Sequence, residues 1–172
     1  AGKIRFWDAK SGRLRGTLEG HKMGITQLSV SADGRRLLSA SIDKTLRLWD
    51  LEKMAEVGSI EDDEGQIYAA AFSPDGKTAL SAGRYGYLTH RNLVDGKTIR
   101  TIRAHEAIIW AVAFSPDGRF ALTAGSDDLV RVWHLESGDR IGIPAEAYPS
   151  CLQCDSVSGS KYSPSFRGVF MN

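Results

Sequence analysis

The chain has 172 residues, of which 42% are hydrophobic and 25% charged, a composition that excludes global disorder and is ordinary for a folded globular protein. Its formal net charge is +1, with 22 basic and 21 acidic residues mixed along the chain, so we expect no nucleic-acid partner. The longest apolar runs, at 67–72 and 108–114, are far shorter than the roughly 18 residues of a membrane-spanning helix, which predicts no membrane span. The chain begins without an initiator Met or a signal-peptide pattern, and we expect its true N-terminus to be missing.

A repeat of 42 residues organises most of the chain. The tetrapeptides SADG (31–34), SPDG (73–76) and SPDG (115–118) are evenly spaced, and KIRFWD (3–8), TLRLWD (45–50), YLTHRN (87–92) and LVRVWH (129–134) follow the same step. A half unit at 3–19 therefore precedes three full units. In the first full unit, alternating apolar residues and Asp-Gly turns predict strands near 25–30, 36–41, 45–49 and 55–60, and the later strands follow by adding 42 or 84.

This pattern resembles the WD-repeat β-propellers, through GH (20–21), SADG (31–34), LLSASIDKTLRLWD (37–50) and their echoes. The resemblance implies an all-β fold, a partial propeller of about three and a half four-stranded blades at 1–143, followed by a short non-propeller tail. A closed propeller needs at least four blades. We therefore expect a fragment of a longer protein, in which missing blades or a second chain cover the open strand edges.

The same resemblance implies a side-chain network of His, Ser or Thr, Asp and Trp in each blade. Two units match it completely, at His21, Ser39, Asp43 and Trp49 and at His105, Thr123, Asp127 and Trp133. A Ser/His/Asp set also occurs in nucleophilic catalysis, but no G-x-S-x-G elbow surrounds Ser39 and the set recurs in each blade, which favours a structural role. The second full unit has Asp63, Tyr85 and Arg91 in place of His, Asp and Trp and retains Ser81, so we expect packing to hold that blade instead.

The tail at 144–172 does not continue the repeat and carries Cys151 and Cys154. A zinc site would need a second ligand pair, and a thioredoxin-like site a βαβ unit, while a disulfide or a free thiol pair stays open. The tail also resembles the start of a c-type cytochrome, through CLQC (151–154) and SPSFRGVF (163–170). That resemblance implies haem attachment at both cysteines, support of an axial His by Pro164, and a periplasmic location. Asp155 stands where the family has the axial His, which predicts an impaired haem site.

The favoured function is a non-catalytic, protein-interaction scaffold with no cofactor and no metal site of its own. The sequence has no H-E-x-x-H or G-x-S-x-G motif, and the acidic run 61–64 is interpreted as a solvated loop. The family resemblance implies partner binding on the channel rim, at Met23, Thr26, Ile42, Glu64, Tyr68, Arg84, Tyr85, Ala107, Trp110 and Ser126, with Tyr68, Arg84, Tyr85 and Trp110 the strongest candidates. Packing against a neighbouring blade is an open alternative for these positions. The alternative function is a propeller and c-type cytochrome fusion in periplasmic electron transfer, with haem c as its cofactor.

Overall fold

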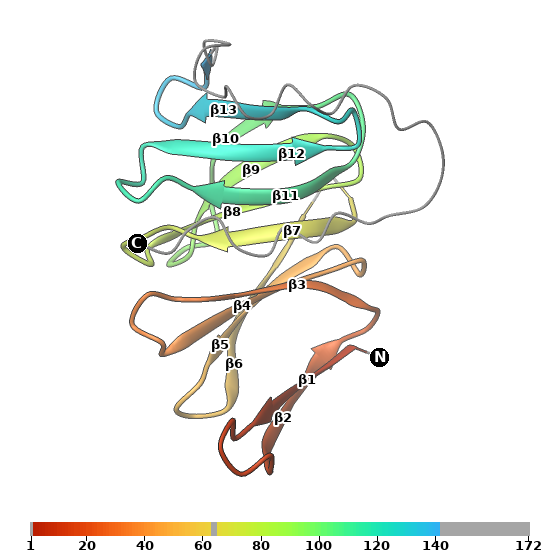
Figure 1. Cartoon of the computed structure of the whole chain (residues 1–172), viewed down its shortest axis with the longest axis vertical. Coiled ribbons are helices and arrows are strands. Elements are labelled where there is room, and N and C mark those ends of the chain that lie inside the picture. The colour runs from red at the N-terminus through yellow and green to blue at the C-terminus, as the bar shows by residue number, and fades with distance from the viewer. Residues whose placement is uncertain (1, 63–64, 142–172) are drawn as a thin grey trace. The chain divides into compact units, whose positions relative to one another are not determined.

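The computed structural model describes residues 2–62 and 65–141, and within them it contains strands and no helix (Figure 1). All described residues fall in one compact unit, Ala1–Gly142. A two-stranded sheet of β1 and β2, called the half-blade, is followed by three four-stranded antiparallel sheets in which the strands pair in chain order. The predicted all-β fold of four-stranded blades is confirmed. The predicted tail at 144–172 lies outside the described residues, and its boundary stays a prediction.

The strands recur at the predicted 42-residue step. The half-blade contains β1 (Gly2–Trp7) and β2 (Leu14–His21). The first blade contains β3 (Ile25–Val30), β4 (Arg36–Ser41), β5 (Thr45–Asp50) and β6 (Ala55–Glu61). The second contains β7 (Ile67–Phe72), β8 (Thr78–Gly83), β9 (Tyr87–Asn92) and β10 (Thr98–Arg103). The third contains β11 (Ile109–Phe114), β12 (Phe120–Gly125), β13 (Val130–His134) and β14 (Arg140–Ile141).

Each Asp-Gly turn between the first two strands of a blade is closed by a serine. In the first blade, the Ser31 hydroxyl donates to Asp33 Oδ1 over 2.5 Å and accepts the backbone N–H of Arg36 over 2.9 Å. The serine hydroxyl and the N–H of Arg35 lower the pKa of Asp33 below its usual value. The same serine and aspartate pair closes the turns of the other two blades. This turn chemistry fixes the register of each hairpin.

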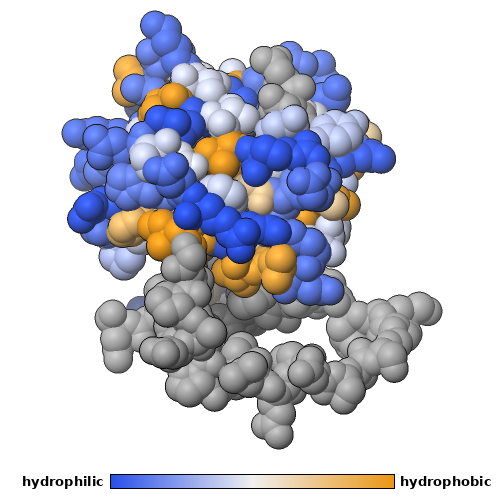
Figure 2. Space-filling model, turned by 90° about the horizontal axis from the view of Figure 1, so that it is seen from above, coloured by the Kyte–Doolittle hydropathy of each residue, from blue (hydrophilic) through white to orange (hydrophobic). Residues whose placement is uncertain are grey.

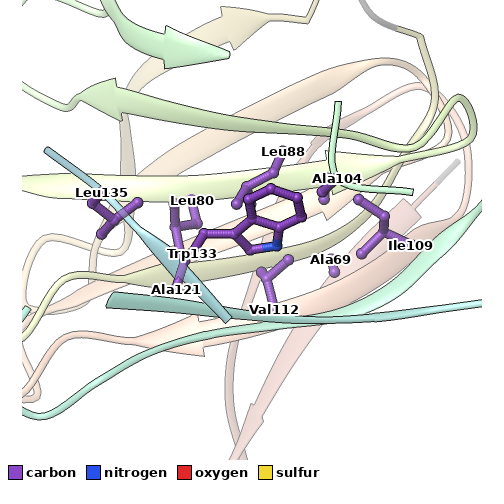
Figure 3. Close-up of a cluster of buried hydrophobic side chains, with 10 residues drawn as sticks. Ala69, Leu80, Leu88, Ala104, Ile109, Val112, Ala121, Trp133 and Leu135 are labelled. Carbon is purple, nitrogen blue, oxygen red and sulfur yellow. The ribbon is translucent and has the colours of Figure 1, made fainter. Parts of the chain in front are cut away.

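The core lies between consecutive blades. Trp133 of the third blade packs against Leu80 and Leu88 of the second, as Figure 3 shows. Leu38 and Leu48 of the first blade form the equivalent cluster with Phe72 of the second. The second blade packs on the first through one face and on the third through the other, so both of its faces are apolar.

The two ends of the repeat array expose residues whose equivalents are buried. Leu28 and Val30 of the first blade are 48% and 55% exposed, whereas the equivalent Ala70 and Phe72 are 1% and 8% exposed. At the other end, Val130 is 49% exposed. Seen from above in Figure 2, apolar side chains form separate patches bordered by hydrophilic ones. That missing blades or a second chain cover these faces stays a prediction.

The turn after each second strand needs a left-handed residue, because Lys44, Gly86 and Asp128 occupy one repeat position with φ of 69°, 77° and 61°. At Gly86 space is also lacking, since a Cβ there would lie 1.9 Å from the carbonyl oxygen of His105. The N–H groups of Ala104 and His105 both donate to the Gly86 carbonyl. The turn between β8 and β9 therefore lies in close backbone contact with the segment that leads from β10 into the third blade.

Replacement of Gly86 by alanine should lower the free energy of unfolding by more than the same change at Gly34. Gly34 has a similar φ of 70° but nothing within 4 Å of the added Cβ. Gly34→Ala should therefore cost only the left-handed strain of about 1–2 kcal/mol. Gly86→Ala must also displace backbone. Urea unfolding of the two variants compares them directly, and equal losses would contradict the steric argument.

Candidate functional site

The first blade contains a continuous buried hydrogen-bond chain. Nδ1 of His21 lies 2.9 Å from Asp43 Oδ2, and Nε2 of the same ring lies 2.7 Å from the Ser39 hydroxyl oxygen. The indole N–H of Trp49 donates to that hydroxyl over 2.8 Å. If the imidazole carries its proton on Nδ1, the serine donates to Nε2 and accepts from the indole, and each of these polar groups has a partner.

Asp43, the aspartate of this hydrogen-bond network, is held ionised. Burial opposes the charge of Asp43, but hydrogen bonds from the Thr45 hydroxyl, from His21 and from two backbone N–H groups outweigh it and lower the pKa. Ser39 is completely buried, and His21 is 3% exposed. The hydroxyl is thus saturated by its two neighbours and closed to solvent, so it offers no approach for a substrate. The arrangement orients strands and supplies no free nucleophile.

The third blade repeats this hydrogen-bond network and adds an arginine, Arg131, to it. His105 bonds Asp127 through Nδ1 and the Thr123 hydroxyl through Nε2, over 2.9 and 2.8 Å, and the indole N–H of Trp133 donates to Thr123 over 3.0 Å. Arg131 also donates to Asp127. Burial raises and these hydrogen bonds lower the pKa of Asp127, with a net shift to about 2. Burial lowers the pKa of His105, so the ring is neutral at pH 7.

The second blade contains a buried ion pair in place of the His and Trp, and the expectation that packing alone holds it is wrong. The Ser81 hydroxyl donates to Asp62 Oδ2 over 3.0 Å, and the Arg91 guanidinium lies 3.3 Å from the same oxygen. Arg91 also donates to the Thr98 hydroxyl. The side chains of Asp62 and Arg91 are 6% and 8% exposed. A charged pair thus lies beside Ser81, whose hydroxyl occupies the same repeat position as those of Ser39 and Thr123. Asp62, one residue before the expected Asp63, supplies the carboxylate.

In each blade the predicted rim positions lie at the same end, where the turn after the second strand is next to the segment before the first strand. The backbone N–H groups of Ile42, Arg84 and Ser126 donate to the carbonyls of Gly24, Gln66 and Ile108, which joins the turn after the second strand to the segment before the first. Met23, Arg84, Tyr85, Ala107, Trp110 and Ser126 are exposed there, and Ile42 is half-buried. Thr26 is exposed, but its hydroxyl donates to the Ile67 carbonyl of the next blade. Glu64 lies outside the described residues.

A β-bulge places the aromatic side chains of this rim. The register of the first strand shifts between Ile67 and Ala69 and between Ile109 and Ala111, which leaves Tyr68 and Trp110 without a direct partner on the second strand. A bulged residue leaves the strict alternation of a strand, and its side chain is re-aimed. The two rings meet edge to face across the blade boundary, with centroids 5.3 Å apart. They form an aromatic pair in which Trp110 is 48% exposed.

Gln66 connects the aromatic pair to the charged part of the rim, a role that the sequence analysis missed. Its Oε1 accepts the Tyr68 hydroxyl over 3.1 Å and the Arg84 guanidinium over 3.3 Å. The repeat equivalents of Gln66 are Gly24 and Ile108, so the repeat contains no signal for it. Tyr85, 54% exposed, lies against Gly65 beside this group. We call Tyr68, Arg84, Tyr85 and Trp110 the rim cluster.

The predicted haem-binding residues Cys151, Cys154 and Pro164, together with Asp155, lie outside the described residues. In residues 2–62 and 65–141, no three His, Cys, Asp or Glu side chains are grouped as metal ligands. No helix in this part of the chain has the length and apolar character needed to cross a membrane.

Residues 12–50 and 96–134 match the family WD domain, G-beta repeat. These two segments are similar to WD40 repeats. They contain the two complete networks, and the match supports a WD-repeat β-propeller. The stretch between them contains β6, β7, β8 and β9, and in it Asp62 and Arg91 replace the His and Trp. No curated protein matches the chain.

The second blade provides a double-mutant test of the ion pair. Arg91→Met should lower the free energy of unfolding by about 3–5 kcal/mol, because the Asp62 carboxylate stays buried without the guanidinium. Asp62→Asn should also destabilise the fold, while the double variant should lose less than the sum of the single losses. Urea denaturation of the four proteins measures the coupling, and additive losses would show that the ion pair does not stabilise the blade.

Mild acid should weaken the fold through His90 and His105. His90 lies between the second and third blades, with Nε2 2.9 Å from the Thr78 hydroxyl and its ring 5.8 Å from that of Phe114. Burial, with the charge of Arg100, lowers the pKa of His90, and burial also lowers the pKa of His105. Their unfolded pKa of about 6.5 is therefore higher than the folded value, so the unfolded state gains protons first as the pH falls below it.

Unfolding free energy should consequently decrease between pH 6.5 and pH 5. His90→Leu copies the equivalent Leu48 of the first blade and should make this decrease smaller, because one of the two histidines is gone. Urea denaturation of both proteins at pH 7.5, 6.5, 5.5 and 5.0 measures the slope. An unchanged slope in His90→Leu would rule out a contribution from His90.

Proposed function

We propose that this chain is a non-catalytic scaffold that binds a protein partner through the rim cluster. The observation that carries the proposal is the aromatic pair of Tyr68 and Trp110, which the β-bulges hold at the exposed end of two adjacent blades. Exposed aromatic and arginine side chains are the residue types that dominate the binding energy of protein interfaces. The family match supports the same general role, since WD40 repeats are typical of protein-interaction scaffolds.

The hydrogen bonds within the rim cluster, and the burial of the hydroxyls in the blades, favour a binding role over catalysis. Tyr68 and Arg84 share Gln66 as an acceptor, so their side chains are oriented before a partner arrives. Pre-orientation reduces the entropy that binding costs. The hydroxyls that resemble a nucleophile, Ser39 and Thr123, are 0% and 1% exposed and saturated by hydrogen bonds. Their environment supports the proposal that the chain is not an enzyme.

Trp110→Ala should abolish or strongly weaken partner capture without unfolding the protein. Immobilised wild-type chain, Trp110→Ala and the control Val94→Ala are incubated with the same extract, and bound proteins are identified by mass spectrometry. Val94 is 89% exposed and lies outside the rim cluster, in the turn between β9 and β10. A protein held by the wild type and the control but lost from Trp110→Ala is then purified and its Kd measured by calorimetry. A hot-spot aromatic should change that Kd by about thirtyfold or more.

A partner retained equally by all three baits would contradict the rim as the binding surface. Circular dichroism melts of the three proteins exclude an unfolding artefact. Among the described residues, Tyr68 is the aromatic ring that contacts Trp110, so Tyr68→Ala should reproduce part of the loss.

The alternative, a propeller and c-type cytochrome fusion, is proposed on the sequence of the tail alone. Cys151 and Cys154 would attach haem c, and Asp155 in place of the axial His would impair both attachment and iron ligation. A pyridine haemochrome assay after co-expression with a haem-attachment system tests it. Asp155→His should load more haem than the unchanged chain, and no haem in either protein would exclude the fusion.

A further inference from the structure

Four Asp-Gly dipeptides occur in the chain, at Asp33, Asp75, Asp95 and Asp117. In such a dipeptide the glycine amide nitrogen can attack the side-chain carboxyl carbon of the aspartate, because glycine has no Cβ to hinder the approach. The attack expels one water molecule and closes a five-membered succinimide ring. Hydrolysis returns the water and yields either aspartate or isoaspartate, in which the backbone runs through the former side-chain carboxyl. No enzyme or co-reactant is needed, so the local structure decides which dipeptide reacts.

Three of the four dipeptides are held by the serine of their turn. The Ser73 hydroxyl donates to Asp75 Oδ1 over 2.6 Å, and the backbone N–H of Gly76 donates to the Ser73 carbonyl over 2.9 Å. The turns at Asp33 and Asp117 contain the same two hydrogen bonds. The attacking nitrogen is thus directed at a carbonyl oxygen. The serine hydroxyl also lowers the pKa of each of these aspartates, which disfavours the neutral carboxyl group that loses water.

The dipeptide of Asp95 and Gly96, in the turn between β9 and β10, lacks both of these restraints. Asp95 Oδ1 accepts the backbone N–H of Lys97 over 3.1 Å, but no hydroxyl of the described residues donates to this carboxylate. The N–H of Gly96 has no acceptor in the described part of the chain, whereas its repeat equivalents Gly12 and Gly138 donate to backbone carbonyls over 2.8 and 2.7 Å. Both the nitrogen that attacks and the carboxyl that is attacked are therefore less restrained here than in the serine-closed turns.

This turn is also open to solvent on one side and in contact with a blade on the other. The side chain of Asp95 is 44% exposed and that of Val94 is 89% exposed, so the water that hydrolyses the ring has free access. A Cβ placed on Gly96 would lie 3.6 Å from Cγ1 of Ile60, in β6 of the first blade. Isoaspartate at position 95 adds one backbone atom to a turn that contacts the preceding blade.

We propose that Asp95 is a site of spontaneous covalent modification, at which the Asp95-Gly96 bond isomerises through a succinimide to isoaspartate faster than any of the serine-closed dipeptides. The product carries a free α-carboxylate, the group that protein isoaspartate methyltransferases esterify with a methyl group from S-adenosylmethionine. The proposal rests on the turns alone and does not depend on the rim cluster or on its partner.

The four dipeptides can be compared within one sample of the full chain. The protein is incubated at pH 6.5 in water enriched in oxygen-18, below the melting temperature found by circular dichroism, and then digested with trypsin. Each dipeptide falls on a different tryptic peptide, and that of Asp95 is NLVDGK (92–97). Hydrolysis of each succinimide incorporates one heavy oxygen, which mass spectrometry detects, and electron-transfer fragmentation identifies isoaspartate.

We expect NLVDGK to gain label about tenfold or more faster than the other three peptides, because their hydrogen bonds to a charged carboxylate must break before ring closure. In concentrated urea the turns are lost, and the four rates should become similar. Asp95→Glu should abolish the label in this peptide, since glutamate would have to close a larger ring. Ser115→Ala should accelerate labelling at Asp117 and leave the rate at Asp95 unchanged.

Equal labelling of the four peptides in the folded protein would overturn the proposal. Label at Asp95 that appears in urea but not in the folded chain would overturn it as well, because the folded turn would then be protective. A rate at Asp117 that Ser115→Ala does not change would contradict the protective role of the serine.

Discussion

Each blade depends on one buried hydroxyl at the centre of its second strand. Ser39, Ser81 and Thr123 occupy this position and are at most 1% exposed. A hydroxyl so deeply buried must be hydrogen-bonded, because loss of its partners would carry a desolvation penalty of about 1–3 kcal/mol. Those partners come from other segments of the blade, His21 and Trp49 for Ser39, so satisfying one oxygen constrains how the strands of a blade meet.

The chain satisfies this requirement in two chemically different ways. The outer two blades use an imidazole, oriented by an ionised aspartate, and an indole N–H. In the middle blade the hydroxyl donates to a carboxylate, and that carboxylate is paired with a guanidinium. A charged pair in the interior has a larger desolvation cost than a neutral pair, and the Nε of Arg91 is left without a hydrogen-bond partner within the described structure. The middle blade is nevertheless apolar on both faces, which offsets part of that cost through packing.

The hydrogen bonds within each blade also explain the direction of the side chains at the bulged position of its first strand. Because the second strand is fixed, the extra residue of each first strand is accommodated as a bulge, and the bulged side chain is directed away from the strand pair. Thr26 uses that position to bond the next blade, whereas Tyr68 and Trp110 form an aromatic pair in which Trp110 is exposed. One backbone irregularity thus contributes to blade contact at one repeat and to the proposed binding surface at the next.

The sequence by itself determined the strands and the two complete networks, because turn chemistry and period-two alternation act over a few residues and the 42-residue step assigns equivalent positions. It could not assign Asp62, since the repeat equivalent of His21 is Asp63 and only the folded backbone brings the earlier carboxylate to Ser81 and Arg91. Tyr68 and Trp110 could be named as rim candidates, but their contact and the role of Gln66 required the bulges and the approach of two blades. Tertiary structure decided these features because they depend on groups far apart in the chain, whose distances no local pattern specifies.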